Sequence, residues 1–246
     1  MINRYPLAIL FCLLVNYACI TRAQTEQDRV HAVITSEKVA TISSPMDGYI
    51  DKLYVKEGSH FKKDGLLLQF DCRLQLAENK KVKAELNLAK LNLDSQQRLN
   101  QLGSASKLKM AEANAQLEKT QAELEISQKK ISDCQITAPF SGQITELFVH
   151  QHETIKANQK IFRILNNQDL IVKLLLPSHW LKKISLGKKF RLFIEETNQI
   201  YQAKVIRIND EVDPVSRSIK IIANIETKTH ALKSGMSGYA IFKGNE

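Results

Sequence analysis

The 246-residue sequence is poor in the residues that mark specialised protein classes. It has nine Gly and five Pro, which excludes collagen-like and low-complexity chains. Aromatic residues make up 7% of the chain and include one Trp, so a platform on which nucleic-acid bases stack is not expected. The net charge is +9, but Lys and Arg never form a long run, and we expect no nucleic-acid partner. The remaining composition is that of a globular protein.

Long hydrophobic runs are also absent. Residues 7–14 are apolar, but this stretch is shorter than the about 20 residues that span a bilayer. Arg4 precedes it and small residues follow near Ala23, a layout typical of a secretory signal peptide. We therefore predict a signal peptide over residues 1–23. Lipidation of Cys19 and an uncleaved membrane anchor are the alternatives.

One internal repeat organises the rest of the chain. Residues 44–50 (Ser-Pro-Met-Asp-Gly-Tyr-Ile) match residues 138–144 (Ala-Pro-Phe-Ser-Gly-Gln-Ile), 94 positions later. In each copy a Pro-x-x-Gly turn precedes alternating apolar residues, which is the pattern of half-buried strands. Copies of about 27 residues are too small to bury a core alone. We predict that residues 44–71 and 135–165 pack as pseudo-symmetric halves of one β-sandwich.

Between the two copies the pattern becomes helical. Residues 73–101 and 106–132 contain no Pro or Gly and are rich in good helix formers. Apolar residues recur there at alternating spacings of three and four, as in the seam of a coiled coil: Val82, Leu86, Ala89, Leu93, Met110, Ala113, Leu117, Leu124 and Ile131. Gly103 permits the chain to reverse, and Ser104 or Ser106 is suited to cap the second helix. We predict an antiparallel coiled-coil α-hairpin over residues 72–134.

The sequence has only four Cys, and Cys12 and Cys19 lie in the predicted signal peptide. The other two, Cys72 and Cys134, are equidistant from Gly103, so they face each other at the base of an antiparallel hairpin. Since export leads to an oxidising compartment, we predict that they form a structural disulfide. Two buried free thiols and a metal site made from these two Cys are the alternatives.

After the second copy, the chain is again β-like. Residues 166–246 contain short alternating runs separated by turns, for example at Gly187 and Gly235, which indicates a small β-barrel. Residues 24–43 are also β-like and are expected to contribute to this barrel. The predicted fold class is α+β and mainly β: a split β-sandwich, interrupted by the hairpin and followed by the barrel.

Five motifs, in their order and spacing, resemble those of the HlyD-type periplasmic adaptors, also called membrane fusion proteins. These motifs occupy residues 44–48, 55–58, 136–142, 212–218 and 232–236. The last two resemble the barrel signatures of adaptors that serve resistance-nodulation-division efflux pumps. The resemblance implies that the sandwich is a split lipoyl-like domain. It also implies a non-enzymatic periplasmic adaptor that bridges an inner-membrane transporter and an outer-membrane channel for export.

The resemblance further implies roles for the hairpin tip and for assembly. Family adaptors contact the channel through an Arg, a Leu and a Ser near the tip, and Arg98, Leu102 and Ser106 are similar to that set. The alternative is a solvated Arg, a Leu that closes the seam and a Ser that caps a helix. A homo-oligomeric ring, a trimer or a hexamer, associated with the inner membrane through its partners, is expected. We expect no membrane-proximal domain after the barrel, which leaves an ABC-type exporter or another membrane protein as the alternative partner.

No cofactor and no catalytic residue are expected. The hairpin occupies the place where a lipoyl-like domain carries its modified Lys, so a biotin or lipoyl carrier-like protein is only an alternative. His150 and His152 share one face of a strand and, with His60 or Glu153, form a candidate metal site, which makes a metal-binding periplasmic protein another alternative. Scattered surface His is the interpretation we adopt. Asp213 precedes a Pro and is interpreted as a turn former. Motifs of nucleophilic or phosphate chemistry are absent from the sequence.

Overall fold

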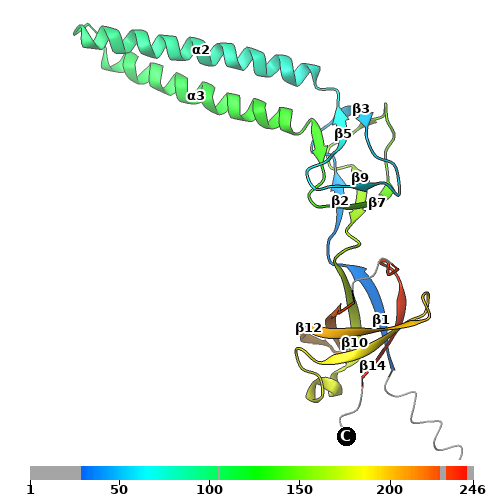
Figure 1. Cartoon of the computed structure of the whole chain (residues 1–246). Coiled ribbons are helices and arrows are strands. Elements are labelled where there is room, and N and C mark those ends of the chain that lie inside the picture. Colours follow the sequence, from blue (N-terminus) through cyan, green and yellow to red (C-terminus); the bar gives the residue numbers. More distant parts are fainter. Residues whose placement is uncertain (1–28, 105, 228–230, 243–246) are drawn as a thin grey trace, which may run out of the picture. The chain divides into compact units, whose positions relative to one another are not determined.

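The computed structural model describes residues 29–104, 106–227 and 231–242, which form two compact units (Figure 1). One unit is continuous and spans Val39–Leu165. The other joins the segment that ends at Lys38 to the segment that begins at Asn166. The predicted signal peptide lies outside the described residues.

The first unit contains a sandwich of two four-stranded sheets. One sheet has the order β2 (Val39–Ser43), β9 (Lys160–Leu165), β7 (Gly142–Leu147), β4 (His60–Phe61). The other has the order β6 (Gln135–Thr137), β5 (Leu66–Phe70), β3 (Gly48–Leu53), β8 (Thr154–Ile155). The core between them consists of fully buried side chains, which include Ile50, Leu67, Leu68, Phe70, Ile144, Ile155, Ile161, Phe162 and Ile164.

The two copies of the internal repeat have closely matching strand bounds and the same strand pairing. The bounds of β7 are those of β3 moved by 94 positions, and the bounds of β8 are those of β4 moved by the same interval. The pairing of Ile50 with Phe70 recurs as that of Ile144 with Ile164, and the same bulge follows each pair. Each sheet contains strands from both copies, so neither copy forms a layer alone. The two copies therefore fold as one intertwined, pseudo-symmetric body.

Two antiparallel helices interrupt the sandwich between β5 and β6 and pack along their length: α2 (Arg73–Gln101) and α3 (Lys107–Ser132) (Figure 1). At 1.5 Å per residue, helices of 29 and 26 residues are about 40 Å long. The first ends in a Schellman motif: Ser104 N–H donates to the Leu99 carbonyl at 2.9 Å and Gly103 N–H to that of Asn100 at 2.9 Å. Gly103 has φ +70°, which Gly adopts without the steric cost of a side chain.

The second unit is a closed, six-stranded antiparallel barrel. Its strands follow the order β1 (Arg29–Ser36), β10 (Leu170–Pro177), β13 (Ser218–Ile225), β12 (Gln199–Asp213), β11 (Lys189–Ile194), β14 (Ser237–Ile241). A short 3-10 helix, η1 (Ser178–Lys182), follows β10. Buried side chains from all six strands fill the interior, among them Ile34, Leu174, Leu192, Ala203, Ile221 and Ala240.

The N-terminal β segment is divided between the two units. Residues 24–43 were expected to contribute to the barrel. In the described part of this stretch, β1 does so, whereas β2 pairs with β9 of the sandwich. The alternation continues in one phase from Val30 in β1 to Ile42 in β2, so the pattern does not mark the division. The division falls after the exposed pair Glu37 and Lys38.

Candidate interaction site on the helical hairpin

The seam between α2 and α3 combines apolar and polar side chains. Val82, Leu86 and Ala89 on α2 are buried as the heptad spacing predicts. The same seam also buries Asn79, and the Nδ2 of this residue donates to Ser127 Oγ on α3 at 2.8 Å. Because an apolar spacing search skips polar residues, this pair was not foreseen, although both positions fit the three-four spacing. A satisfied buried polar pair favours one register of the two helices over its alternatives.

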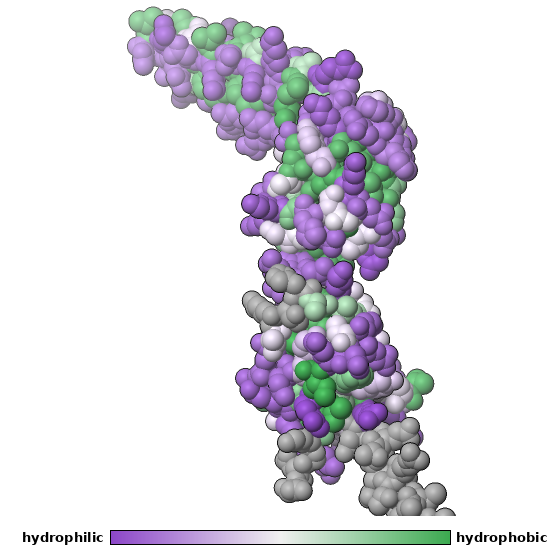
Figure 2. Space-filling view, turned by 45° about the vertical axis from the view of Figure 1, so that its right-hand side comes forward, coloured by the Kyte–Doolittle hydropathy of each residue, from purple (hydrophilic) through white to green (hydrophobic). Residues whose placement is uncertain are grey.

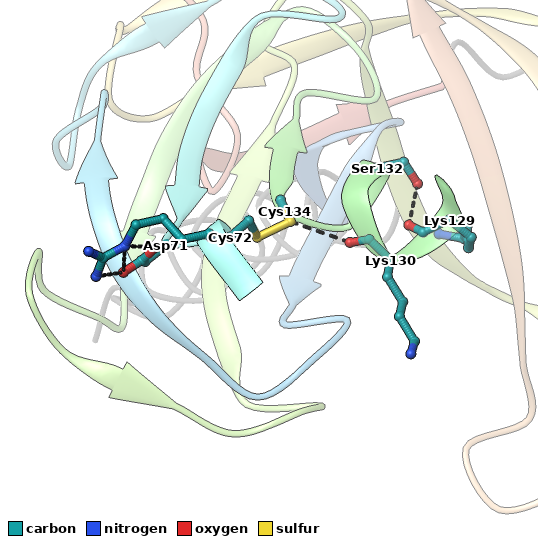
Figure 3. Close-up of a disulfide and its surroundings, with 7 residues drawn as sticks. Asp71, Cys72, Lys129, Lys130, Ser132 and Cys134 are labelled. Carbon is teal, nitrogen blue, oxygen red and sulfur yellow. Dashed lines mark hydrogen bonds and ion pairs between the residues drawn. A yellow bond between two sulfur atoms is a disulfide. The ribbon is translucent and has the colours of Figure 1, made fainter. Parts of the chain in front are cut away.

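The base of the hairpin is covalently closed. Cys72 and Cys134, 62 positions apart in the sequence, form a disulfide with a Cα–Cα distance of 6.1 Å. Figure 3 shows this bond joining the start of α2 to the segment that follows α3. Asp71 accepts hydrogen bonds from the backbone N–H of Arg73 at 3.2 Å and from its guanidinium at 2.7 Å. These bonds from Arg73 lower the pKa of the Asp71 carboxyl. The carboxylate thereby lies at the positive end of the α2 dipole.

The three predicted tip residues are all solvent-exposed. Leu102 is 77% exposed and does not close the seam. Ser106 stands at the N-cap position of α3, but its side chain makes no capping hydrogen bond. The exposed Ser104 likewise provides no cap. Arg98 forms an ion pair with Asp94 at 2.8 Å, one turn before it on α2. A core role for Leu102 and a capping role for Ser106 are therefore wrong, whereas the solvated Arg is present with its exposed partner.

A second apolar stripe on α2 runs into this tip. Its leucines are spaced as in a heptad pattern but remain exposed, at 77% for Leu74, 69% for Leu88, 67% for Leu91 and 77% for Leu102. Figure 2 shows hydrophobic residues among hydrophilic ones along the hairpin. Leu88 and Leu91 are neighbours on this face, whereas Lys81 stands between Leu74 and Leu88, and Ser95 and Arg98 stand between Leu91 and Leu102. The neighbouring pair of exposed leucines favours a surface that a partner helix covers. The spacing of these leucines was present in the sequence, but the analysis did not single them out as a second surface.

The two helices also enclose a groove of about 630 Å³ on one face of the hairpin. Its rim carries Lys81 and Leu88 from α2, and Lys119 and Ile126 from α3. Thr120, which is buried in the seam, lies in its lining. A shallow groove with apolar and charged rim residues fits the side of another helix better than it fits a small molecule.

The candidate metal residues are accounted for by ordinary contacts. His152 has φ +70° and occupies the turn position that Gly58, with φ +81°, holds in the first copy. Its Nδ1 lies 3.0 Å from Tyr49 Oη, and the two rings stack. His150 Nδ1 lies 3.8 Å from a carboxylate oxygen of Glu153. Within the described ranges, no three His, Cys, Asp or Glu residues are grouped to hold a metal ion.

Asp213 acts as a turn former, as the sequence indicates. Its Oδ1 accepts hydrogen bonds from the backbone N–H of Val215 at 3.0 Å and of Ser216 at 2.8 Å, and from Ser216 Oγ at 3.0 Å. These bonds lower the pKa of the Asp213 carboxyl.

Among the residues that the structure describes, no helix has the length and apolar character needed to cross a membrane.

The chain matches a known family of proteins in sequence. The model of the RND membrane fusion protein (MFP) barrel-sandwich hybrid domain matches residues 38–167, more than half of the chain. The nodulation protein NolF of Rhizobium meliloti is 24% identical over 223 residues, which cover 85% of this chain and 61% of NolF. The macrolide export protein MacA of Yersinia pestis is 27% identical over 157 residues, which cover 52% of this chain and 42% of MacA. The chain therefore spans about half the length of these curated relatives.

A solved structure shows the same fold. A MacA–MexA chimera that contains the Pseudomonas aeruginosa MexA α-hairpin domain superposes with a TM-score of 0.76 and 22% sequence identity. The match covers 87% of this chain and 81% of the chimera. Proteins of the matched kind are non-enzymatic adaptors, which agrees with the prediction that this chain is not an enzyme.

Proposed function

Because the chain belongs to the family of RND membrane fusion proteins, we propose that it is the periplasmic adaptor subunit of a tripartite export system. The family resemblance drawn from the sequence motifs is confirmed by this match. The observation that carries the proposal is the set of exposed leucines at related heptad positions, Leu88 and Leu91 on α2 and Leu102 at its C-cap. A stripe with this spacing is suited to packing against helices of another protein.

In this proposal the α-hairpin is a two-stranded coiled coil that reaches the outer-membrane channel. The disulfide at its base and the Asn79–Ser127 pair in its seam support the proposal, because both keep the two helices in one register. Arg98, Leu102 and Ser106 contact the channel. An inner-membrane transporter is the second partner, and several copies of the chain, three or six, form the surrounding ring. The signal peptide directs the chain to the periplasm.

The contact at the tip is tested by substitution in the intact protein. We expect Leu102→Asp to reduce export about tenfold or more, because full burial of a leucine side chain contributes about 1.5–3 kcal/mol and about 1.4 kcal/mol corresponds to a factor of ten in binding. Leu175→Asp is the matched control, since Leu175 is 60% exposed on the barrel. Export by each variant is measured in cells at equal protein abundance. Unchanged export by Leu102→Asp would refute the docking role.

The protein that contacts the hairpin tip is identified by crosslinking. A photoreactive amino acid at position 102 is expected to crosslink an outer-membrane channel protein, whereas the same residue at position 175 is not. Identification of the crosslinked protein by mass spectrometry decides the outcome. A crosslink from position 102 only to other periplasmic proteins would contradict the proposal. Capture of the inner-membrane partner from the same cells decides whether it is a resistance-nodulation-division or an ABC-type transporter.

A further inference from the structure

One end of the barrel gathers several exposed connections. Because the six strands are antiparallel, β10 ends at Pro177 at the same end at which β11 begins at Lys189 and β1 begins at Arg29. The turn from β12 to β13 lies at this end as well, since Ser178 N–H donates to the Arg217 carbonyl at 2.8 Å. The chain thus enters the barrel next to the β10–β11 connection, residues 178–188.

Two apolar side chains fasten the β10–β11 connection to the barrel. The ring of Trp180 meets that of Phe242 edge-on at a centroid distance of 5.9 Å, and Ile184 is buried. With these residues turned inward, the leucines beside them face outward: Leu181 is 39% exposed and Leu186 is 67% exposed. Figure 2 shows hydrophobic and hydrophilic residues side by side on the surface of the barrel.

The same connection is strongly basic. Residues 178–189 contain four lysines and no Asp or Glu. Lys182 and Lys183 are exposed and form no ion pair within the part of the chain that the structure describes, whereas Lys189 pairs with Glu226 at 2.8 Å. The neighbouring β12–β13 ribbon brings acidic residues to this end of the barrel, Asp210, Glu211 and Asp213. The carboxylate of Asp213 is engaged by its own turn.

We propose that the β10–β11 connection binds the surface of a bilayer that contains anionic phospholipid. Exposed leucines insert at the boundary of headgroups and acyl chains, and flexible lysines beside them reach the lipid phosphates. A protein partner is less well matched, since lysine is depleted at the centres of protein interfaces. This inference does not rest on the proposed export function. It places the barrel end at which β1 begins against the membrane.

Binding to vesicles tests the inference with the predicted mature chain, residues 24–246. Both folded units lie within residues 29–242, so removal of the predicted signal peptide leaves them intact. We expect sedimentation with vesicles of phosphatidylcholine mixed with phosphatidylglycerol, weaker sedimentation with phosphatidylcholine alone, and a decline with added salt. The double variant Lys182→Gln/Lys183→Gln is expected to bind about 30-fold more weakly, because each lysine near an anionic surface contributes to binding separately.

Matched variants separate this site from a general effect of charge. Lys80→Gln/Lys83→Gln removes two exposed lysines from α2 and is expected to leave vesicle binding unchanged. Leu186→Ser is expected to weaken binding about tenfold through lost apolar insertion. Circular dichroism verifies the fold of each variant, and the lysine pair suffices if the leucine variant does not fold. Equal binding by both lysine pairs, no preference for anionic vesicles, or capture of an acidic protein without vesicle binding would overturn the inference.

Discussion

Single residues in this protein are constrained most tightly where two backbones approach each other. Gly142 begins β7, and a Cβ at this position would overlap the carbonyl oxygen of Leu165 in β9. Its counterpart in the first copy is Gly48, where a Cβ would lie 2.8 Å from Cδ1 of Phe70. A backbone oxygen in a ladder cannot move without loss of pairing, whereas an aromatic ring can rotate or shift.

The two glycines are therefore expected to differ in their tolerance of alanine. We expect Gly142→Ala to lower the free energy of unfolding by about 3 kcal/mol and Gly48→Ala by about 1 kcal/mol. Denaturant unfolding followed by circular dichroism measures both values. Equal losses at the two positions would show that the close approach to β9 is not the constraint.

Acid affects one turn of the barrel through a single carboxyl. The hydrogen bonds from Ser216 and Val215 lower the pKa of Asp213 from its ordinary value of 3.8. Because the folded state prefers the carboxylate, its stabilisation is present above pH 3.8 and is lost as the pH falls through the lowered pKa. We expect NMR titration of Asp213 to give a midpoint below 3.8, and Asp213→Asn to remove the acid sensitivity of this turn. A midpoint at or above 3.8 would contradict the hydrogen bonding described.

At the scale of elements, the hairpin depends on what closes its base. Phe70 N–H donates to the carbonyl of Cys134 at 2.9 Å, which extends the pairing of β5 with β6 towards the helices. Cys134 itself forms the disulfide with Cys72. The covalent bond thus begins where the sheet pairing ends. It prevents the helices from separating at the point where they leave the sandwich.

The disulfide is expected to contribute substantially to stability. For a closed loop of 62 residues, the chain-entropy relation gives about 4 kcal/mol, so Cys72→Ser/Cys134→Ser should lower the free energy of unfolding by up to this amount. Thermal unfolding with and without a thiol reductant provides the measurement. The reductant should lower the midpoint of the native protein and leave that of the double variant unchanged. A native midpoint that does not respond to full reduction would refute this role.

At the scale of the whole molecule, the two units differ in how the sequence builds them. The sandwich and hairpin come from the single segment Val39–Leu165. The barrel needs β1, which pairs with β10 on one side and with β14 on the other. Closure of the barrel therefore requires one segment that precedes the other unit in the sequence and one that follows it.

Separate production of the two units tests this difference. Residues 39–165 alone are expected to fold cooperatively, because they contain their whole core. Residues 166–246 alone lack β1, so β10 and β14 each lose one of their two neighbouring strands and the barrel stays open; we expect no cooperative unfolding transition from them. Addition of a peptide that covers residues 29–38 should restore it. A cooperative transition of residues 166–246 without that peptide would contradict this account.

The part of the fold that local patterns specify could be predicted closely. The predicted helix over residues 73–101 has the bounds of α2, because helix formers fill it and Gly103 ends it. The repeat predicted that two distant segments pack together, because neither contains enough apolar residues for a core. The equal spacing of Cys72 and Cys134 from Gly103 placed the two thiols at one height of an antiparallel pair, and the structure joins them.

The residues of the candidate site on the hairpin could be predicted from the sequence only in part. Spacing identified Val82 and Leu86 as seam residues, but it missed the buried Asn79 because the search counted only apolar residues. Its choice of this seam over the second stripe of Leu88 and Leu91, which follows the same period, is confirmed by the burial of Val82, Leu86 and Ala89. The contacts with α3 show that Asn79 belongs to the covered stripe.

The amino-acid sequence by itself determined the type and length of the elements, the repeat and the point of chain reversal, because these depend on neighbours a few residues apart. The tertiary structure alone decided that β2 leaves the barrel for the sandwich, that the two copies share both sheets, and that Leu102 stays exposed. Each of these outcomes depends on which distant segment packs against a residue and excludes water from it. The periodicity of the sequence does not specify that segment.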